Sequence, residues 1–529
     1  MTEQVMFEID TCETTGDLEH SWRFIGYDEC NYTYMPEGMD LLKKFASLGD
    51  APYFFRTHFM FCTGNSYPTM KFGSTNLYSE DAEGNPIYNY EYFDRVIDAY
   101  LAAGAKPFIE FGFMPMDLAD ENYLPPQDNA KLQDYKIAGW ACPPKDYDKW
   151  HDLITNVICH LRDTYGEKEI STWYYELWNE PDIFYWHGSN QEYFKLYDYT
   201  EKAVHEVLPQ LRLGGPAIAL SMGFLDSFLK HCKSGVNYCT GAVGTKLDYV
   251  TFHVKGGGFS FNLTPPKQNP TVEMLLDAVK AGLDIMVKNG FADRELVLSE
   301  ADPDGWAAGS MYDNPNLVFR NTEYYASYVA YTYDKLEKLS ESYKIPIRPL
   351  AWAFFFPGER CFEGTRTFTT QGINKAIFNL FKIYGQLGDK KLRCEMKDSR
   401  GVSDVGGYAV QGENRETQIV IYSHNNDREL AGTREIRLEI SGHCEAQGLK
   451  VTHHRIDGEH SNAYAQWLKE GSPLYPQGEQ YERIKLCDRL EEHHAPTAVS
   501  YADNKVSIAF AMPAHGVSLL VVSEDAKAS

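Results

Sequence analysis

Two glutamates that end apolar, β-rich segments are the residues of this sequence best suited to chemistry. Glu180 follows the run Trp173–Trp178, and Glu300 follows the run Glu295–Ser299. The end of a buried strand is a costly place for a charge unless that charge has a task. A pair of carboxyl groups, one protonated and one ionised, is the minimum equipment for cleaving a glycosidic bond. The fold must therefore bring these two side chains together if the chain is to do this chemistry.

The elements that would position them lie between about residues 20 and 390, where short apolar runs alternate with amphipathic stretches. The eight expected strands are His20–Tyr27, Tyr53–Phe59, Ala105–Phe113, Thr172–Trp178, Leu211–Pro216, Leu247–Val254, Glu295–Ser299 and Pro349–Phe356. The expected helices are Gly38–Leu48, Tyr92–Ala103, Asp146–Tyr165, Gln191–Leu208, Phe224–Ser234, Val272–Asn289, Asn321–Ser340 and Gly372–Leu387. Strands that alternate with helices predict a parallel sheet. Eight such repeats predict a (β/α)8 TIM barrel with insertions over residues 15–390.

A doubly wound open sheet is the rival architecture, but it would not need eight units. No GxGxxG fingerprint follows an expected strand, and Gly256–Gly258 lacks the helix that such a fingerprint requires. In a barrel the carboxyl ends of the strands form the active face, so Glu180 would lie at the tip of strand four and Glu300 at the tip of strand seven. These tips can converge across the mouth, and a separation of about 5 Å would suit a retaining double displacement. The spacing alone does not say which glutamate donates the proton.

After about residue 390 the pattern changes to short β-type runs that are separated by Gly, Asn and Asp turn signals. These runs are Tyr408–Gln411, Thr417–Ser423, Glu435–Ile440, Lys450–Ile456, Lys505–Phe510 and Ser518–Val522. They predict an antiparallel β-sandwich over residues 391–529, an accessory domain beside the barrel. The N-terminal segment 1–14 can add the strand Val5–Asp10 to it, because a lone strand needs a sheet.

The chain has 529 residues, of which 43% are hydrophobic, so it can bury a large core in two or three domains or in one barrel with an appendage. Its formal net charge of −25 repels polyanions, and we therefore expect neither nucleic acid nor a membrane as a partner. The longest apolar run, Leu350–Phe356, is too short to span a bilayer. Aromatic residues make up 14% of the chain, which fits both a large core and a set of rings that stack on sugars.

The 11 cysteines are scattered without a CxxC pair, which argues against a disulfide framework and against a zinc site. Reduced thiols in a cytoplasmic protein are the simplest interpretation, and the segment Met1–Glu8 carries no secretory signal. No HxxEH-type spacing or cluster of Asp and His ligands indicates a metal-dependent hydrolase. We therefore expect no metal and no cofactor, and the sequence holds no signal that decides the oligomeric state.

The motif Trp178–Pro181 resembles the acid/base signature of clan A glycoside hydrolases. More specifically, nearly the whole chain resembles glycoside hydrolase family 39, which contains β-xylosidases and α-L-iduronidases. Further segments that resemble this family are Pro86–Tyr90, Pro107–Pro115, Gly214–Ala217 and Met512–Leu520. The resemblance implies Glu180 as the general acid/base and Glu300 as the nucleophile.

The resemblance also implies contacts to the substrate. Asn179 would hydrogen-bond the sugar 2-hydroxyl, a contact that strengthens in the transition state. His253 matches a sixth-strand histidine near the nucleophile, and His58 matches a second-strand histidine that contacts the sugar. Either histidine could instead be a hydrogen-bonded core residue, and Arg56 could simply neutralise a buried carboxylate.

Lys255, two residues after the sixth-strand histidine, bears on the identity of the sugar. The xylosidases used for comparison carry an aromatic residue there, whereas the iduronidases carry a lysine that contacts the substrate carboxylate. Gly305 and Trp306 resemble the iduronidase residues whose backbone groups help to hold the same carboxylate. A rim lysine paired with Asp302 or Asp304 is the alternative interpretation of Lys255.

Other positions weigh against an iduronidase. Some bacterial members assigned as xylosidases are similar to this chain at His253, Lys255 and Gly256. The iduronidase aspartate of the eighth strand is absent from Ala351–Phe356.

The loop after the eighth expected strand holds further candidates. The arginine that iduronidases carry in this region could be Arg360 or Arg366. The family often uses a glutamate there for sugar hydroxyls, and of Glu359 and Glu363 we favour Glu359.

We therefore expect a retaining exo-glycoside hydrolase that acts on a carbohydrate substrate. A β-D-xyloside and an α-L-iduronide share their configuration at C1 to C4 and differ at C5, so one catalytic frame can serve both. The favoured expectation is a β-D-xylosidase that releases xylose from non-reducing ends. The alternative is an α-L-iduronidase-like enzyme, or another glycosidase that recognises a C5 substituent through Lys255. An inactive sugar-binding protein on the same fold is the remote alternative.

Overall fold

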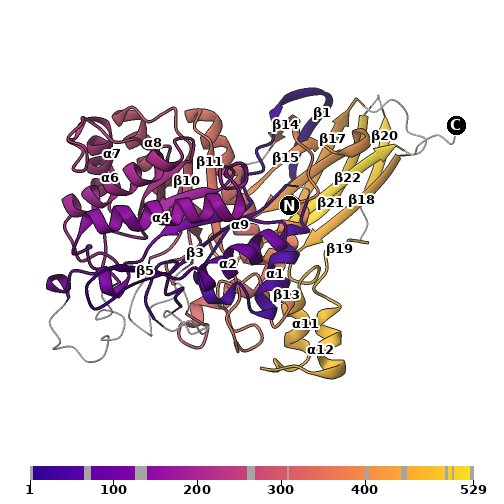
Figure 1. The fold of residues 1–529 in the computed structure, drawn as a ribbon. Coiled ribbons are helices and arrows are strands. Elements are labelled where there is room, and N and C mark those ends of the chain that lie inside the picture. The colour runs from indigo at the N-terminus through magenta and orange to yellow at the C-terminus, as the bar shows by residue number, and fades with distance from the viewer. Residues whose placement is uncertain are drawn as a thin grey trace.

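The computed structural model describes residues 4–49, 51–64, 73–124, 140–258, 269–306, 309–398, 404–442, 449–494, 498–502 and 505–524. These residues form a closed barrel surrounded by helices and, beside it, a large sheet (Figure 1). Along the chain, the first strand belongs to the sheet, the barrel follows, and the later strands return to the sheet.

Eight parallel strands close the barrel in the order β10, β11, β2, β3, β6, β7, β8, β9. They are β2 (Phe24–Glu29), β3 (Phe54–His58), β6 (Lys106–Phe111), β7 (Tyr174–Leu177), β8 (Leu213–Ile218), β9 (Tyr249–Lys255), β10 (Leu296–Asp302) and β11 (Ile347–Trp352). Almost every residue of these strands is buried, as expected where helices cover the outside and side chains fill the inside. The eight strands and the TIM barrel predicted from the sequence are confirmed, with shifts of a few residues at the strand ends.

Helices follow the strands and cover the barrel. They are α1 (Pro36–Ala46), α2 (Glu91–Ala102), α4 (Tyr147–Tyr165), α5 (Glu167–Ile170), α6 (Asn190–Val207), α7 (Met222–Ser234), α8 (Val272–Asn289), α9 (Glu323–Tyr343) and α10 (Ala376–Tyr384). In α8 the apolar residues Leu275, Val279, Leu283 and Met286 recur on one face and are buried, and the helix ends at Gly290 with a left-handed φ of 80°. The predicted helices are confirmed. Among the described helices, none is long and apolar enough to cross a membrane.

The barrel interior changes from apolar to polar along the strands. A cluster of mostly aromatic side chains fills one layer: Phe24, Phe54, Phe108, Tyr174, Tyr249, Val297, Leu350 and Trp352. Strand β8 contributes Gly214 here, because a Cβ at that position would lie 2.2 Å from the ring of Tyr249. Alternate strand residues face the same side. The next residues on that side, two positions after Phe54, Phe108 and Tyr174, are the buried polar residues Arg56, Glu110 and Glu176.

The second unit is one curled ten-stranded sheet with the strand order β19-β18-β22-β16-β15-β14-β1-β17-β21-β20. Its strands are β1 (Gln4–Asp17), β14 (Lys390–Asp398), β15 (Val405–Gln411), β16 (Thr417–Ser423), β17 (Thr433–Ser441), β18 (Leu449–Ile456), β19 (Glu491–Glu492), β20 (Ala498–Ala502), β21 (Lys505–Pro513) and β22 (Gly516–Glu524). Residues from β1, β14–β17, β21 and β22 share one apolar core. Two short hairpins lie outside both units, β4 (Tyr78–Glu80) with β5 (Pro86–Tyr88), and β12 (Thr369–Thr370) with β13 (Ile373–Asn374).

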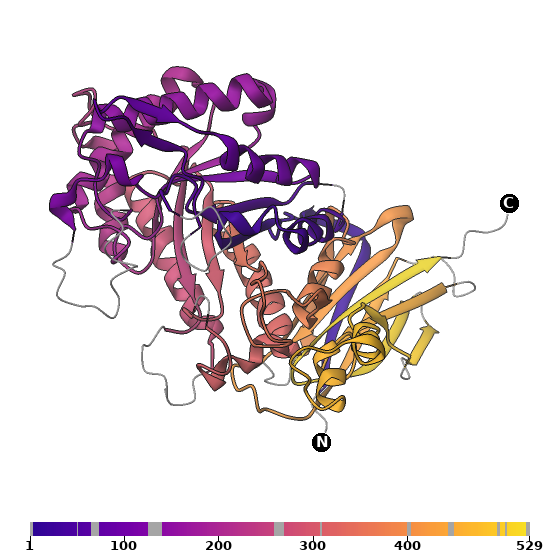
Figure 2. The same cartoon turned by 60° about the horizontal axis from the view of Figure 1, so that its bottom comes forward.

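Strand β1 lies between β14 and β17, and its indigo ribbon is seen among the orange and yellow strands in Figure 2. Val5, Phe7 and Ile9 alternate with more exposed residues and are buried in the core. β1 is antiparallel to β14 but parallel to β17, with Val5 opposite Ile436. The prediction of a wholly antiparallel arrangement is therefore wrong at the β1–β17 pair. No hairpin connects these two strands, so no turn fixes their relative direction.

Two short helices between β18 and β19 were not predicted, α11 (Ala463–Lys469) and α12 (Gly478–Lys485). They pack on the loop that follows β11. The rings of Phe362 and Trp467 have centroids 5.5 Å apart, and the amide of Cys361 donates to the carbonyl of Leu474 at 2.8 Å. This helical hairpin therefore supports a loop of the barrel rim.

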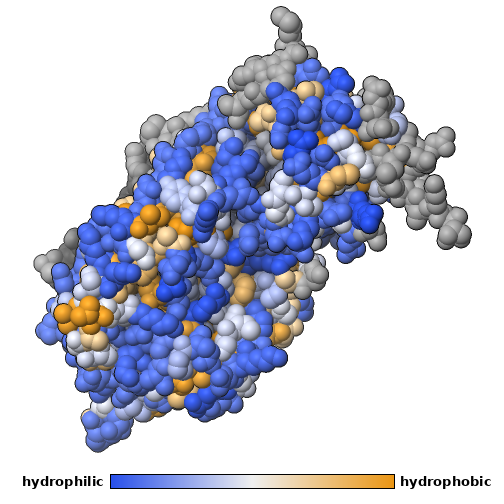
Figure 3. Space-filling model, turned by 90° about the horizontal axis from the view of Figure 1, so that it is seen from above, coloured by the Kyte–Doolittle hydropathy of each residue, from blue (hydrophilic) through white to orange (hydrophobic). Residues whose placement is uncertain are grey.

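The surface seen from above in Figure 3 is mainly hydrophilic, with apolar residues in small separate groups. This pattern agrees with the formal net charge of −25, which favours a dispersed, well-hydrated protein.

Candidate active site

Glu180 lies in a turn directly after β7. The strand ends at Leu177, and Trp178 and Glu180 have φ angles of 67° and 49°. Left-handed conformations are costly for residues with a Cβ, and they persist where the surrounding structure holds the chain in place. The amide of Glu180 donates to the carbonyl of Ala217 in β8 at 2.9 Å. This hydrogen bond holds the turn against the neighbouring strand.

Glu300 lies within β10 and not beyond its end. In the pairing of β10 with β9, Glu300 is opposite His253 and Asp302 is opposite Lys255. Because alternate residues of a strand face the same side, this register brings the four polar side chains to one side of the two strands. β8 and β9 separate β7 from β10 in the barrel.

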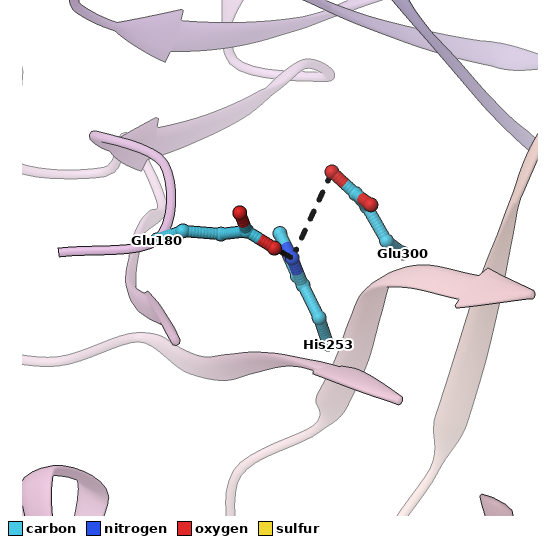
Figure 4. A group of neighbouring side chains, drawn as sticks. All are labelled: Glu180, His253 and Glu300. Atoms are coloured by element: carbon cyan, nitrogen blue, oxygen red, sulfur yellow. Dashed lines mark hydrogen bonds and ion pairs between the residues drawn. The ribbon is translucent and has the colours of Figure 1, made fainter. Parts of the chain in front are cut away.

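His253 connects the two glutamates (Figure 4). Its Nδ1 lies 2.8 Å from Oε1 of Glu180 and 3.7 Å from Oε1 of Glu300. Its Nε2 is buried and has no hydrogen-bond partner among the described residues. The Nδ1 atom and one oxygen of each glutamate all lie within 4.8 Å of one another. This spacing is close to the ~5–5.5 Å between carboxyl groups of retaining glycosidases. Among the described side chains it is also the one His, Asp, Glu or Cys group compact enough to hold a cation.

Glu300 is surrounded by cationic groups. Nζ of Lys255 lies 2.6 Å from its Oε2, and Nε2 of His58 lies 3.8 Å from its Oε1. Burial would raise the pKa of Glu300, but the neighbouring cations outweigh burial and hold this pKa well below 4.5. In order of effect, the neighbouring groups that lower this pKa are Lys255, His253, Arg366 and His58. Glu300 is therefore ionised at neutral pH.

A buried ion network orients Asn179. Arg56 donates to Glu176 at 2.6 Å and to Oδ1 of Asn179 at 3.1 Å, and it lies 2.9 Å from Glu110. Burial alone would lower the pKa of Arg56. The carboxylates of Glu176 and Glu110 raise this pKa by more than burial lowers it, so Arg56 stays charged. Nδ1 of His58 lies 2.8 Å from Glu110, which raises the pKa of this imidazole despite its burial. Because Oδ1 of Asn179 accepts from Arg56, its Nδ2 group remains as the donor.

Lys255 bridges two carboxylates. Besides Glu300 it contacts Asp302, as one of the two interpretations of this lysine predicted. Arg366, from the loop after β11, also donates to Asp302. Arg366 is therefore the arginine close to the glutamates, whereas Arg360 pairs with a glutamate of its own loop. The two cations Lys255 and Arg366 therefore lie beside the two carboxylates of Glu300 and Asp302.

Glu359 belongs to a separate buried cluster. Oγ1 of Thr365 donates to its Oε2 at 2.7 Å, and its Oε1 has no hydrogen-bond partner among the described residues. Burial raises the pKa of Glu359 to about 7, against the opposing charge of Lys375. No described contact joins Glu359 to Glu180 or Glu300.

Gly305 and Trp306 lie in the loop after β10. The amide of Trp306 donates to Oδ1 of Asp304 at 2.8 Å, and its carbonyl accepts from Arg320. The backbone groups of Trp306 are therefore engaged within the loop. Of the predicted site residues, the structure brings together Glu180, Glu300, His253, Lys255, His58 and Asn179, and shows no described contact between these six and Gly305, Trp306 or Glu359.

Two residues at this site were not predicted. Glu110 holds His58, and it carries the signal that identified the two glutamates, a charge in a buried strand. Trp352 lies with its ring centroid 5.0 Å from that of His58, and nothing in its apolar strand distinguished it from a core residue. The interpretation that Arg56 neutralises buried carboxylates is confirmed.

The model of the family "Glycosyl hydrolases family 39" matches residues 7–503 of this chain. The chain is 27% identical over 450 residues to a beta-xylosidase of Caldicellulosiruptor saccharolyticus, and the aligned region covers 83% of this chain and 84% of that protein. It is 24% identical over 368 residues to the alpha-L-iduronidase of Mus musculus, and this aligned region covers 64% of this chain and 56% of that protein.

Among solved structures, a bacterial orthologue of human α-L-iduronidase matches with a TM-score of 0.79 at 20% identity, over 100% of this chain and 85% of that one. A likeness at this identity shows the fold alone, and the fold agrees with the barrel and sheet described above. The match to the family model spans most of the chain and includes both paired glutamates. The protein is therefore a glycoside hydrolase, and the chain belongs to glycosyl hydrolase family 39.

Proposed function

We propose that this protein is a retaining exo-β-D-xylosidase with Glu180 as general acid/base and Glu300 as nucleophile. One observation carries the proposal: two carboxyl groups lie within 4.8 Å of each other on either side of His253, in unlike surroundings. Glu300 is held as a carboxylate by Lys255, as a nucleophile must be. Glu180 contacts no described lysine or arginine, and its described side-chain partner is the imidazole of His253 at 2.8 Å. The two carboxyl groups therefore stand in different surroundings, as their two proposed roles require.

In the first step, an oxygen of Glu300 bonds to the anomeric carbon while the bond from that carbon to the leaving oxygen breaks. Glu180 gives its proton to the leaving oxygen, so a neutral alcohol departs and a xylosyl ester of Glu300 remains. Oε1 of Glu300 is the better attacking atom. Its neighbours stand 3.7 Å and 3.8 Å away, whereas Oε2 is bonded to Lys255 at 2.6 Å.

In the second step, Glu180 is ionised and takes a proton from water as the water oxygen attacks the anomeric carbon. The bond to Glu300 breaks, its carboxylate is restored, and the sugar leaves with its original configuration. Nδ1–H of His253 can donate to the ionised Glu180 at 2.8 Å. This hydrogen bond supports the base form of Glu180 in the step that requires it.

Asn179 and His58 complete the proposed sugar site. The Nδ2 group of Asn179 is the donor left for the sugar 2-hydroxyl, because Arg56 occupies its oxygen. A hydrogen bond to this hydroxyl strengthens as positive charge develops at the anomeric carbon. His58 stands between Glu110 and Glu300, so we assign it a contact to a sugar hydroxyl beside the nucleophile.

The balance of charge favours a xyloside over a uronide. Lys255 and Arg366 are the lysine and the arginine that act most strongly on the charge of Glu300, and Glu300 and Asp302 already pair with them. A third carboxylate on C5 of the sugar would have to compete for these cations in a buried site, which is costly. A xyloside has no substituent on C5. The beta-xylosidase of Caldicellulosiruptor saccharolyticus, at 27% identity, also supports this choice.

A glycosidase for a C5-substituted sugar such as an α-L-iduronide is the second candidate. The observation in its favour is that Lys255 and Arg366 both lie beside the nucleophile, where they could bind a substrate carboxylate once Asp302 moved. We keep Gly305, Trp306 and Glu359 as candidate contacts of either sugar, supported by their positions in the loops after β10 and β11.

A panel of nitrophenyl glycosides tests the assignment: β-D-xyloside, α-L-arabinoside, β-D-glucoside and uronides. We expect the highest kcat/KM on the β-D-xyloside, β-xylose as the first product by NMR, and xylose alone as the first sugar released from xylotriose. A higher kcat/KM on a uronide would overturn the choice of sugar. α-Xylose as the first product would overturn the retaining mechanism, and absence of turnover on the whole panel would favour the sugar-binding alternative.

We further propose that residues 15–390 form the catalytic domain, and that residues 391–529 and segment 1–14 form an accessory β-sandwich. The pairing of β1 with β14 and β17 supports this division, as does the apolar core that they share. Limited proteolysis should cut between these units before it cuts within either.

A further inference from the structure

A second carboxylate lies two residues beyond Glu180 and binds the backbone of a neighbouring turn. Oδ1 of Asp182 accepts from the amide of Ala219 at 2.7 Å, and its Oδ2 accepts from the amides of Leu220 and Ser221 at 2.8 and 2.7 Å. Those three residues connect β8 to α7. One side chain therefore ties the turn after β7 to the turn after β8.

The turn after β7 and the end of β8 both contain residues in left-handed conformations. Ala217, in β8, has a φ of 52°, and Trp178 and Glu180 have the φ angles given above. The amide of Glu180 already joins its turn to β8 at one point, the carbonyl of Ala217. A turn held at one point can still pivot, and conformations of this kind persist only where several contacts determine them. The three bonds to Asp182 supply the further points.

The turn after β8 is a firm anchor. Oγ of Ser221 accepts from the amide of Phe224 at 3.2 Å and caps the start of α7, a helix of 13 residues. Amides at a helix start are partly positive and bind anions well. The carboxylate of Asp182 is therefore matched in charge to the place where it binds.

We propose that Asp182 is a positioning residue that holds the general acid/base Glu180 in line with the leaving oxygen. The inference rests on the proposed role of Glu180 and extends it to the residue that fixes the turn. Asp182 acts through the backbone and has no described contact with the catalytic pair or with His253. Its loss would let Glu180 turn away from the glycosidic oxygen, and a misplacement of about 1 Å can cost ~10²-fold in rate.

Such an effect depends on the leaving group. A sugar leaving group needs a proton as it departs, so its release depends on a well-placed acid. A 2,4-dinitrophenolate departs without a proton, so its release does not. Damage to Glu180 alone should therefore slow the natural type of substrate much more than the activated one, whereas general damage to the fold should slow both alike.

The test compares kcat/KM on xylobiose and on 2,4-dinitrophenyl β-D-xyloside for the wild type and for Asp182→Asn. Asparagine keeps the shape but presents an NH₂ group to amides that need an acceptor. We expect a loss of ~10²-fold on xylobiose and of less than about 5-fold on the activated xyloside. Azide attacks the anomeric carbon of the xylosyl ester in place of water and, as an anion, needs no general base, so it should raise kcat of the variant on the activated xyloside.

Two further variants make the outcome decisive. Asp226→Asn removes a carboxylate on α7 that binds Lys230 and Asn289, and it should leave both activities unchanged. Glu180→Gln should show the same dependence on the leaving group as Asp182→Asn, and more strongly. Equal losses on both substrates in Asp182→Asn, or no loss, would overturn the inference while leaving the proposed function intact. A lack of leaving-group dependence in Glu180→Gln would overturn the proposed function itself.

Discussion

The turn that carries Glu180 and the strand that carries Glu300 hold the same functional group in opposite ways. Glu180 stands outside its strand, in a left-handed turn, and its side chain is hydrogen-bonded to His253. Glu300 stands inside β10, in regular pairing with β9, with Lys255 bonded to one oxygen. One carboxyl group is held by a backbone that is anchored from the neighbouring turn, and the other by charges.

This difference is consistent with the different parts that we propose for these two identical side chains. A nucleophile needs a permanent negative charge at a fixed point, which a strand and a ring of cations provide. An acid/base must gain and lose a proton in each cycle, and strong cations beside it would hold it ionised. The barrel supplies a rigid strand for the first and a turn for the second.

The largest expected effect comes from removing Glu300, the proposed nucleophile. Glu300→Gln should lower kcat by about 10⁴-fold or more on every glycoside, activated or not, because the covalent step itself is lost. Steady-state kinetics on 2,4-dinitrophenyl β-D-xyloside and on xylobiose would measure it.

Glu295→Gln is the matched control for that variant, because Glu295 directly precedes β10 at the other end of the barrel and pairs with Arg212. It should keep near wild-type activity. Substantial turnover by Glu300→Gln would remove Glu300 from the covalent step and erase the contrast between the two glutamates.

A smaller effect should follow when the main cation beside the nucleophile is removed. Lys255→Met keeps the length of the side chain and removes its charge, so the pKa of Glu300 should rise. Fewer molecules then carry ionised Glu300 at acidic pH, and the acidic limb of the kcat/KM profile on the β-xyloside should move to higher pH. An unchanged limb would show that Lys255 does not control this charge.

Lys280→Met, which removes a surface lysine of α8 that pairs with Asp277, should leave the profile as it is. The same two variants on uronides separate the candidate sugars, because a selective loss on uronides in Lys255→Met would support recognition of a substrate carboxylate.

The smallest expected effect is on stability. The pKa of Glu300 is depressed in the folded protein, so its ionised form stabilises the fold above the unfolded value of 4.5, and this stability is lost as the pH falls through the lower, folded value. The difference in Tm between the wild type and Glu300→Gln should therefore be constant above about pH 5 and shrink below it. Thermal unfolding followed between pH 3 and pH 7 would measure it, and a difference independent of pH would contradict the electrostatic account.

Much of the barrel could be predicted because its signals are local. Each strand is an apolar run, each helix repeats its apolar residues with a helical period, and Glu180 and Glu300 stand out as charges at strand ends. The arrangement of β1 could not be predicted, because a strand's partner and direction depend on segments far away in the chain. The helices α11 and α12 were missed because both are short and lie among β-type runs.

The sequence predicted the site residues that stand out by their type alone. It did not predict the features that depend on which residues contact one another in the fold. Lys255 had two interpretations from its sequence, and its contacts with Glu300 and Asp302 show that the same lysine touches the nucleophile and a rim aspartate. The choice between Arg360 and Arg366 needed the path of a loop, which the sequence does not give. Trp178 and Glu180 have positive φ angles, and the amide of Glu180 is bound by Ala217 of the neighbouring strand, so no local pattern in the sequence announced this turn.

The place of β1 in the sheet has a consequence for how the protein is made. β1 leaves the ribosome before the barrel, but its partners β14 and β17 lie after the barrel, with Val5 opposite Ile436. At about 5–20 residues per second, β1 must wait roughly 20 to 90 s for its neighbours. During that time its alternating apolar residues and unpaired backbone are available to other chains. At high expression, aggregates should therefore form first through β1. A chaperone that covers exposed strands should raise the yield of folded protein more than one that acts on the finished barrel.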